Sequence, residues 1–183
     1  MGIRTPEYTP ILVPNHHDIT SRESKMSLGV TILHTPGHTP DEIALFDEAE
    51  MMLYVGDSLY EYEHIIFPNQ GSIVTWFSSM EFLVSFVKSK NAQVTSSTGA
   101  TRPREVLINS GHVTALRPAL DVLLSAITFM QDVVDGTEKA KKREWRRGEA
   151  TVTYEQEGNR FSLRCPERLV LEARQVKETY EMA

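Results

Sequence analysis

Residues 32–46 read ILHTPGHTPDEIALF and place two histidines four positions apart around a Pro-Gly pair. The segment runs an apolar strand into Gly37, puts His38 directly after it and then resumes an apolar strand. Glycine allows backbone angles and close approaches that other residues resist. Side chains just past a strand end lie at a rim, where proteins often mount ligands and catalytic groups. The stretch therefore predicts two strands joined by a tight turn that carries a functional histidine.

The same arrangement occurs twice more along the chain. LYVGD places Asp57 after Gly56, and LINSGH places His112 after Gly111. If the three strands end at one rim, two imidazoles and a carboxylate converge there. Those groups suit a zinc-like ion that keeps positions open for water, and metal-bound water is a nucleophile near neutral pH. The alternative for each residue taken singly is a turn with a solvated or core-capping side chain.

Hydrophobic periodicity predicts strands and helices in alternation. Short runs of branched and aromatic residues between turn residues are typical of strands, and apolar residues at spacings of three and four are typical of helices. We expect strands at 11–13, 28–35, 42–48, 51–57 and 104–111, a hairpin over 150–165, helices over 73–87, 118–135 and 165–180, and a loop over 91–104. The strands 42–48 and 51–57 are close enough in sequence to form a hairpin. The alternation predicts an α/β fold.

Composition limits the classes of function. A chain of 183 residues that is 40% hydrophobic and 24% charged is an ordinary globular chain with room for one core. The net charge of −6 gives no general reason to expect nucleic acid or an anionic membrane as a partner. No run approaches the roughly 18 apolar residues that a membrane span needs. Cys165 is the only cysteine, so no intrachain disulfide forms and we expect a reducing, cytoplasmic location.

The motifs HTPGHTPDEIALF, LYVGDSLY and INSGH, in that order, resemble the later motifs of the metallo-β-lactamase superfamily over residues 28–118. The resemblance implies an αββα sandwich, with a mixed sheet and flanking helices, and a site for up to two zinc ions at one edge. It implies that His38 ligates the first metal, that Asp57 bridges the two metals and that His112 ligates the second. Members of the superfamily hydrolyse lactams, lactones, thioesters and phosphodiesters, and the run GDSLYEYEHIIFPNQGS resembles the thioester- and lactone-cleaving relatives.

The first metal-binding motif of that family, HxHxDH, is missing from the 37 residues before His38. NHHDI is the one candidate to replace it, with His16, His17 and Asp18. Adjacent side chains on an extended segment point to opposite sides, so a polar surface loop is the alternative for all three. Each lost ligand also removes a constraint on geometry, and we therefore expect zinc binding that is weak or absent.

We expect a single, incomplete metallo-β-lactamase-like domain over residues 1–183. Its motifs lie within about 28–135, and a C-terminal hairpin and helix occupy about 136–183.

Five more residues are candidates around the site. A ligating histidine usually donates its second N–H to a neighbouring group, and residues after the bridging aspartate are placed to line a substrate mouth, with a surface loop as the alternative. The candidates are His34 and Asp41 as orienting partners, and Tyr60, Tyr62 and His64 at the mouth.

Two functions from different classes remain open. The first is a metallo-β-lactamase-fold hydrolase of a small-molecule acyl, thioester, lactone or ester bond, truncated and of reduced or no activity alone. The second is a non-catalytic, metal-poor remnant acting as an interaction domain. Half of a sandwich exposes a sheet face and edges that favour association with a copy of itself or a complementing chain. The basic run KAKKREWRR at 139–147 is more typical of a solvated strand than of a nucleic-acid patch, and we expect neither nucleic-acid nor membrane partners.

Overall fold

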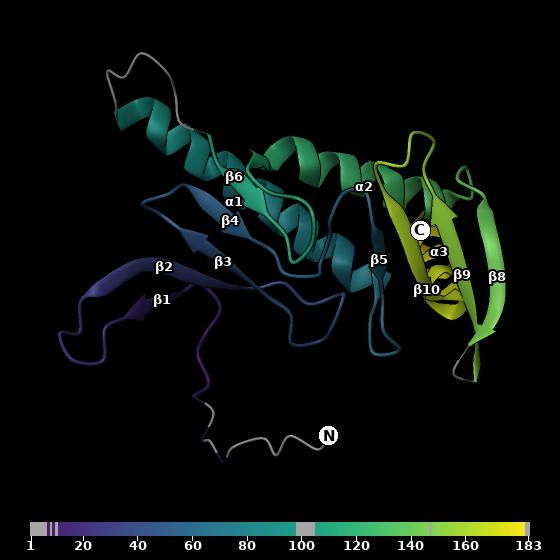
Figure 1. Cartoon of the computed structure of the whole chain (residues 1–183), viewed down its shortest axis with the longest axis horizontal. Coiled ribbons are helices and arrows are strands. Elements are labelled where there is room, and N and C mark those ends of the chain that lie inside the picture. The colour runs from purple at the N-terminus through teal and green to yellow at the C-terminus, as the bar shows by residue number, and fades with distance from the viewer. Residues whose placement is uncertain (1–6, 8, 10, 98–104, 147, 182–183) are drawn as a thin grey trace.

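The computed structural model describes residues 7, 9, 11–97, 105–146 and 148–181. It forms two sheets, one six-stranded in the order β1-β2-β3-β4-β6-β7 and one four-stranded in the order β5-β10-β9-β8, with three flanking helices (Figure 1). The elements are β1 (His17–Thr20), β2 (Ser27–His34), β3 (Ile43–Asp47), β4 (Met52–Tyr54), β5 (His64–Ile66), α1 (Ile73–Ser97), β6 (Leu107–Asn109), β7 (Arg117–Pro118), α2 (Ala119–Asp135), β8 (Ala140–Arg146), β9 (Glu149–Glu155), β10 (Ser162–Pro166) and α3 (Glu167–Glu181). The predicted α/β class, with mixed sheets and flanking helices, is confirmed.

The three motif strands, β2, β4 and β6, belong to the six-stranded sheet, where β3 lies between β2 and β4 and where β4 and β6 are neighbours. β2 and β4 both pair antiparallel with β3, which confirms the predicted hairpin, and β4 pairs parallel with β6. Two parallel neighbouring strands must be joined by a crossover connection. Most of the connection between β4 and β6 is the helix α1. Because β2, β4 and β6 run in the same direction, their ends lie at one edge of the sheet. The turns carrying His38, Asp57 and His112 follow there, and we call them the motif rim.

Helix α1 packs its apolar stripe on the sheet. Ile73, Trp76, Met80, Leu83 and Val87 recur at spacings of three and four and are buried, each contributing about 1.5–3 kcal/mol. The helix continues to Ser97, so the predicted loop is wrong over 91–97, while 98–104 lies outside the described residues. Polar residues without Gly or Pro can extend a helix on its solvent side.

Helix α2 begins one residue after Pro118 and ends at Gly136, whose left-handed conformation (φ 74°) lets its N–H bond to Val133 O. The predicted stop at this glycine is confirmed. The predicted terminal hairpin is also confirmed as β9 and β10, with Gly158 and Asn159 at positive φ in its turn. The basic run forms β8, which pairs with β9 at the edge of the four-stranded sheet.

One predicted strand is misplaced. Residues 11–13 are not in a strand, and Ile11 and Leu12 are 86% and 94% exposed. Prolines at positions 10 and 14 bracket this run, and proline has no N–H to donate to a sheet. The N-terminal strand is instead β1, which pairs with β2.

The two faces of the six-stranded sheet differ. On one face Leu33, Ala44, Phe46, Leu53 and Ile108 are all fully buried. On the other, Ile43 and Tyr54 remain 46% and 41% exposed. In Figure 1, α1 lies above the sheet and no helix of the described part lies below it. We call this lower side, which carries Ile43 and Tyr54 and has no helix of the described residues over it, the open face.

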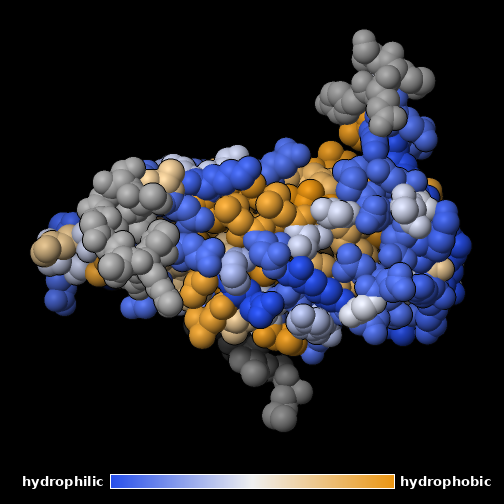
Figure 2. All heavy atoms as spheres, turned by 90° about the horizontal axis from the view of Figure 1, so that it is seen from above, coloured by the Kyte–Doolittle hydropathy of each residue, from blue (hydrophilic) through white to orange (hydrophobic). Residues whose placement is uncertain are grey.

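The outer surface of the helical layer is also partly apolar. Seen from above in Figure 2, apolar atoms form a strip between polar margins. A groove of about 330 Å³ between the helices is lined by Val74, Phe77, Val134 and Val176 among others. No helix of the described residues is long and apolar enough to span a membrane.

Candidate functional site

Gly37 brings the first motif turn against the start of α1. A Cβ added at this position would lie 2.4 Å from Trp76 Cα, and its φ of 148° falls where side chains are disfavoured. The Gly37 carbonyl accepts from Ser72 N at 2.7 Å, at the beginning of the helix. Only glycine permits this contact, which fixes the backbone that carries His38.

The other two motif glycines allow the turns to touch one another. A Cβ on Gly56 (φ 54°) would lie 2.6 Å from Glu42 Oε1, and one on Gly111 would lie 2.4 Å from Asp57 Oδ1. Gly111 N also donates to Gly56 O. The repeated glycine therefore has one physical role, which is to let three turns pack at a single edge.

His38 is held at both ring nitrogens. Nδ1 lies 3.0 Å from Glu42 Oε2, and Nε2 lies 3.1 Å from the carbonyl oxygen of Ile66 in β5. A carboxylate and a carbonyl both only accept, so this arrangement favours the protonated ring, in which both nitrogens donate. Burial by itself lowers the pKa of His38, but the bond to Glu42 and the charges of Glu42 and Asp57 outweigh it and raise the pKa.

Asp57 and His112 meet at the same rim. His112 Nε2 lies 3.6 Å from Asp57 Oδ1, and both side chains are about half exposed. The Tyr60 ring stands edge-on to the His112 ring with centroids 5.1 Å apart. Burial, then the charge of Asp57, raises the pKa of Tyr60. The structure thus brings two of the three predicted ligands into contact, with the third close enough to respond to Asp57.

These residues do not by themselves make a metal centre. Among the residues that the structure describes, no group of three or more His, Cys, Asp and Glu side chains is arranged to hold an ion. Both ring nitrogens of His38 face protein acceptors, so the ring would have to leave one of them to give a nitrogen to a metal. Two of the three candidates to replace the missing HxHxDH motif contact other groups. His16 packs on Phe82, and Asp18 accepts a hydrogen bond from Thr31 Oγ1.

The carboxylate beside His38 belongs to Glu42, one residue after the predicted Asp41, which is exposed. The signal for it was present in TPGHTPDE, where a glutamate follows the histidine by four positions. His34 is exposed and its Nε2 lies 3.2 Å from Pro40 O rather than at His38. Neither predicted orienting residue contacts His38 among the described interactions.

The three residues predicted at a substrate mouth lie together. Tyr60, Tyr62, His64 and His112 line one surface cavity of about 620 Å³, which we call the tyrosine depression. His64 is part of β5, a strand that the sequence did not predict, and its Nδ1 lies 2.8 Å from Ser162 Oγ on β10. The parallel pairing of β5 with β10 joins the motif half of the chain to the C-terminal hairpin at this depression.

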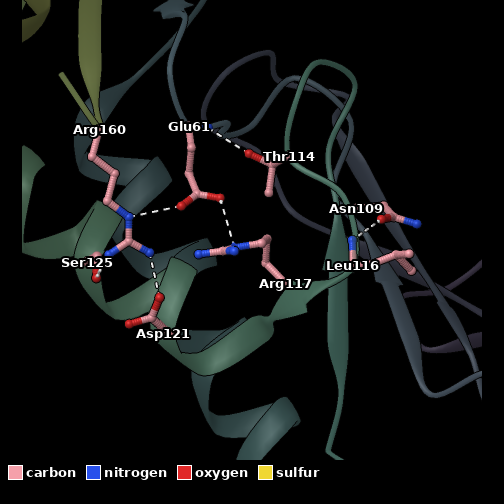
Figure 3. Close-up of polar contacts among 8 residues, drawn as sticks. All are labelled: Glu61, Asn109, Thr114, Leu116, Arg117, Asp121, Ser125 and Arg160. Atoms are coloured by element: carbon pink, nitrogen blue, oxygen red, sulfur yellow. Dashed lines mark hydrogen bonds and ion pairs between the residues drawn. The ribbon is translucent and has the colours of Figure 1, made fainter.

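A buried ion-pair cluster holds the segment between Tyr60 and Tyr62 (Figure 3). Glu61 is 1% exposed and accepts from Arg160 Nε at 2.9 Å, with Arg117 Nε 3.9 Å from its other oxygen. Arg160 also bonds Ser125 and Asp121 on α2. A buried carboxylate is stable only when it is paired, so this cluster fixes the tyrosine segment to α2 and the hairpin.

Comparison with known proteins agrees with this geometry. The sequence model of the metallo-beta-lactamase superfamily matches residues 2–112. The chain belongs to this superfamily. A metallo-beta-lactamase family protein of Thermus thermophilus, TTHA1429, superposes with a TM-score of 0.51 at 14% identity, over 76% of this chain and 41% of that one. The likeness shows a shared fold.

Members of the metallo-beta-lactamase superfamily generally bind metals such as zinc or iron, and the solved structure of TTHA1623 is of a di-iron-bound form. That structure is 21% identical, has a TM-score of 0.37 and is matched over 61% of this chain and 46% of its own. A curated relative, the "Putative transcription factor avaE" of Aspergillus versicolor, is 22% identical over 169 residues. The match covers 88% of this chain and 46% of the relative, so the chain spans less than half of that protein's length.

Proposed function

We propose that this chain supplies one half of a metal-dependent hydrolase site for a small-molecule acyl, thioester, lactone or ester bond, and that it has little or no activity alone. The supporting observation is the motif rim, where Asp57 and His112 lie 3.6 Å apart beside a cavity large enough for a small molecule. The same rim has too few ligands among the described residues to hold an ion. A second segment would supply the remaining ligands.

The rim has further signs of incompleteness. The hydroxyls of Ser58, directly after Asp57, and of Ser110, two residues before His112, are buried without a hydrogen-bond partner in the described part of the chain. A buried polar group without a partner costs about 1–3 kcal/mol. A segment that packs on the rim and offers polar groups would remove this cost.

The chain's own residues would bind and orient. Glu42 fixes the His38 ring, Asp57 and His112 lie close enough to contribute to one metal site, and the tyrosines line the adjacent depression. Zinc is the metal that we propose, by analogy with the superfamily. A cytoplasmic location is proposed because the lone thiol of Cys165 is buried and needs no oxidising compartment.

The test is a zinc titration of the purified chain, with elemental mass spectrometry of the unchelated protein. We expect less than one zinc per chain as isolated, weak binding in excess zinc, and loss of that binding in His38→Ala, Asp57→Ala and His112→Ala. Glu50→Gln, at an exposed carboxylate in the β3–β4 turn at the opposite end of the strands, is the control and should bind as the parent does. Stoichiometric zinc with chelator-sensitive ester hydrolysis by the chain alone would contradict the half-site proposal. No binding in excess zinc would contradict the proposal that this site binds zinc.

A second candidate, an interaction domain, is favoured by the open face. Ile43 and Tyr54 are exposed on neighbouring strands there. Exposed contiguous apolar surface of this kind marks association sites. A second copy of the chain or a complementing polypeptide would cover it.

Light scattering after gel filtration separates these outcomes. A mass of twice the chain that falls to one chain in Ile43→Lys would identify a homodimer through the open face. Leu124→Lys, at an equally exposed leucine on α2 (45% against 46%), should leave the mass unchanged. A monomer in the parent protein would exclude the homodimer and leave a complementing chain as the partner. A dimer that both lysine variants retain would show that the open face is not the interface.

A further inference from the structure

The tyrosine depression has aromatic walls and an acidic lining. Its volume of about 620 Å³ is within the range of small-molecule sites. Tyr62, which is 59% exposed, provides most of the aromatic surface, since Tyr60 is only 4% exposed, and Glu63 and Glu155 provide two carboxylates. None of the described residues that line it is Lys or Arg.

Tyr62 is held in place by its backbone. Its φ of 65° lies in the left-handed region that a tyrosine adopts only when its surroundings impose it. The bond from Tyr62 N to Arg160 O at 2.7 Å, together with the burial of Glu61 beside it, imposes it here. The ring is therefore presented at the mouth by a rigid segment.

The charges around the depression are mostly negative. Asp57, next to His112, adds a third carboxylate, and the charges of Asp57 and Glu63 both act to raise the pKa of Tyr60 after its burial. Arg164 acts in the opposite direction but is outside the lining. Arg160 is already paired with Glu61 and Asp121, and Lys141 lines an adjoining cavity rather than the depression itself. An anion entering the depression would therefore lose water and meet carboxylates, with no Lys or Arg among the described lining residues.

We propose that the tyrosine depression selects uncharged or cationic substrates that carry a ring or an ammonium group, and rejects anionic ones. The inference rests on the proposed function, because it names the substrate class of the same site. A cation gains from the carboxylates and from the exposed ring of Tyr62, and a neutral ring gains apolar contact. Uncharged lactones and esters and ammonium-bearing esters meet this requirement. Phosphodiesters, and thioesters or lactams that carry anionic groups, do not.

The experiment measures binding rather than turnover, so it does not depend on metal or activity. Benzyltrimethylammonium, benzyl alcohol and benzoate share one ring and differ in charge. Their dissociation constants are measured on the whole chain by nuclear magnetic resonance titration at low salt. We expect the cation to bind about tenfold more tightly than the anion, with the alcohol between them, and the difference to shrink as salt screens the carboxylates.

Variants locate the effect. Glu155→Gln and Glu63→Gln should each reduce the preference for the cation about threefold, and Tyr62→Ala should weaken the cation and the alcohol together. Glu50→Gln, an exposed glutamate in the β3–β4 turn, removes the same charge outside the depression and should change nothing. Benzoate binding as tightly as the cation, a preference unchanged in Glu155→Gln, or no binding of any probe would overturn the inference. Failure of the zinc titration with this binding order intact would overturn only the proposed function.

Discussion

Replacement of Arg160 by alanine should destabilise the fold far more than loss of an ordinary surface ion pair. Glu61 is 1% exposed, and Arg160 gives it the shorter of its two ionic contacts, 2.9 Å against 3.9 Å for Arg117. Removing one partner of a buried pair costs about 3–5 kcal/mol, because a buried charge is left behind. We expect about 3 kcal/mol, the lower end, because Arg160 is partly exposed and Arg117 remains close to the carboxylate.

Urea unfolding followed by circular dichroism measures this cost. In the Glu61→Gln background the carboxylate is absent, so Arg160→Ala should cost only about 1 kcal/mol, and the two substitutions should not be additive. Arg143→Ala, which removes an exposed ion pair with Glu167, is the control and should leave the midpoint unchanged. A cost below 1 kcal/mol for Arg160→Ala, or equal costs in both backgrounds, would refute the assignment of a buried, paired Glu61.

Three further predictions concern single residues. Gly37→Ala should lower the free energy of unfolding by about 2–4 kcal/mol, because its Cβ would meet Trp76 Cα at 2.4 Å; an unchanged urea midpoint would contradict this contact. His38 has a raised folded pKa, so its contribution to stability is fully present below the unfolded pKa of about 6.5 and is lost as pH rises through the folded value. Urea midpoints across this window should show that loss in the parent and not in Glu42→Gln, and a pH dependence shared by both would assign it to other groups. Burial raises the pKa of the Cys165 thiol to about 12, so the native chain should resist dithionitrobenzoate at pH 8 and react once unfolded in urea; rapid reaction of the native chain would mean that the thiol is accessible.

The sequence predicted well whatever depends on neighbours along the chain. The β3–β4 hairpin, the stop of α2 at Gly136 and the turn at Gly158 follow from periodicity and from residues with special backbone freedom, and these are local properties. The two wrong predictions came from local patterns that are too weak to decide whether a segment is a loop, a helix or a strand. Polarity alone over 91–97 did not stop α1, and an apolar run at 11–13 did not make a strand between two prolines.

The candidate site shows the same division. The sequence named His38, Asp57 and His112 through their glycines, and the structure places Asp57 against His112. The sequence did not reveal β5, because this strand has only three residues and is too short to show a periodicity. The acceptor for His38 Nε2, Ile66 O, therefore could not be predicted.

By itself the sequence determined the superfamily, the α/β class and the residues that follow the three glycines, because each is written in a short contiguous motif. Only the tertiary structure decided what those residues contact. The pairing of His38 with Ile66, of Tyr62 with Arg160 and of β5 with β10 joins residues up to about a hundred positions apart. Such contacts depend on strand register and on which face of a sheet a helix covers, and both are set by burial of the whole core rather than by any local pattern.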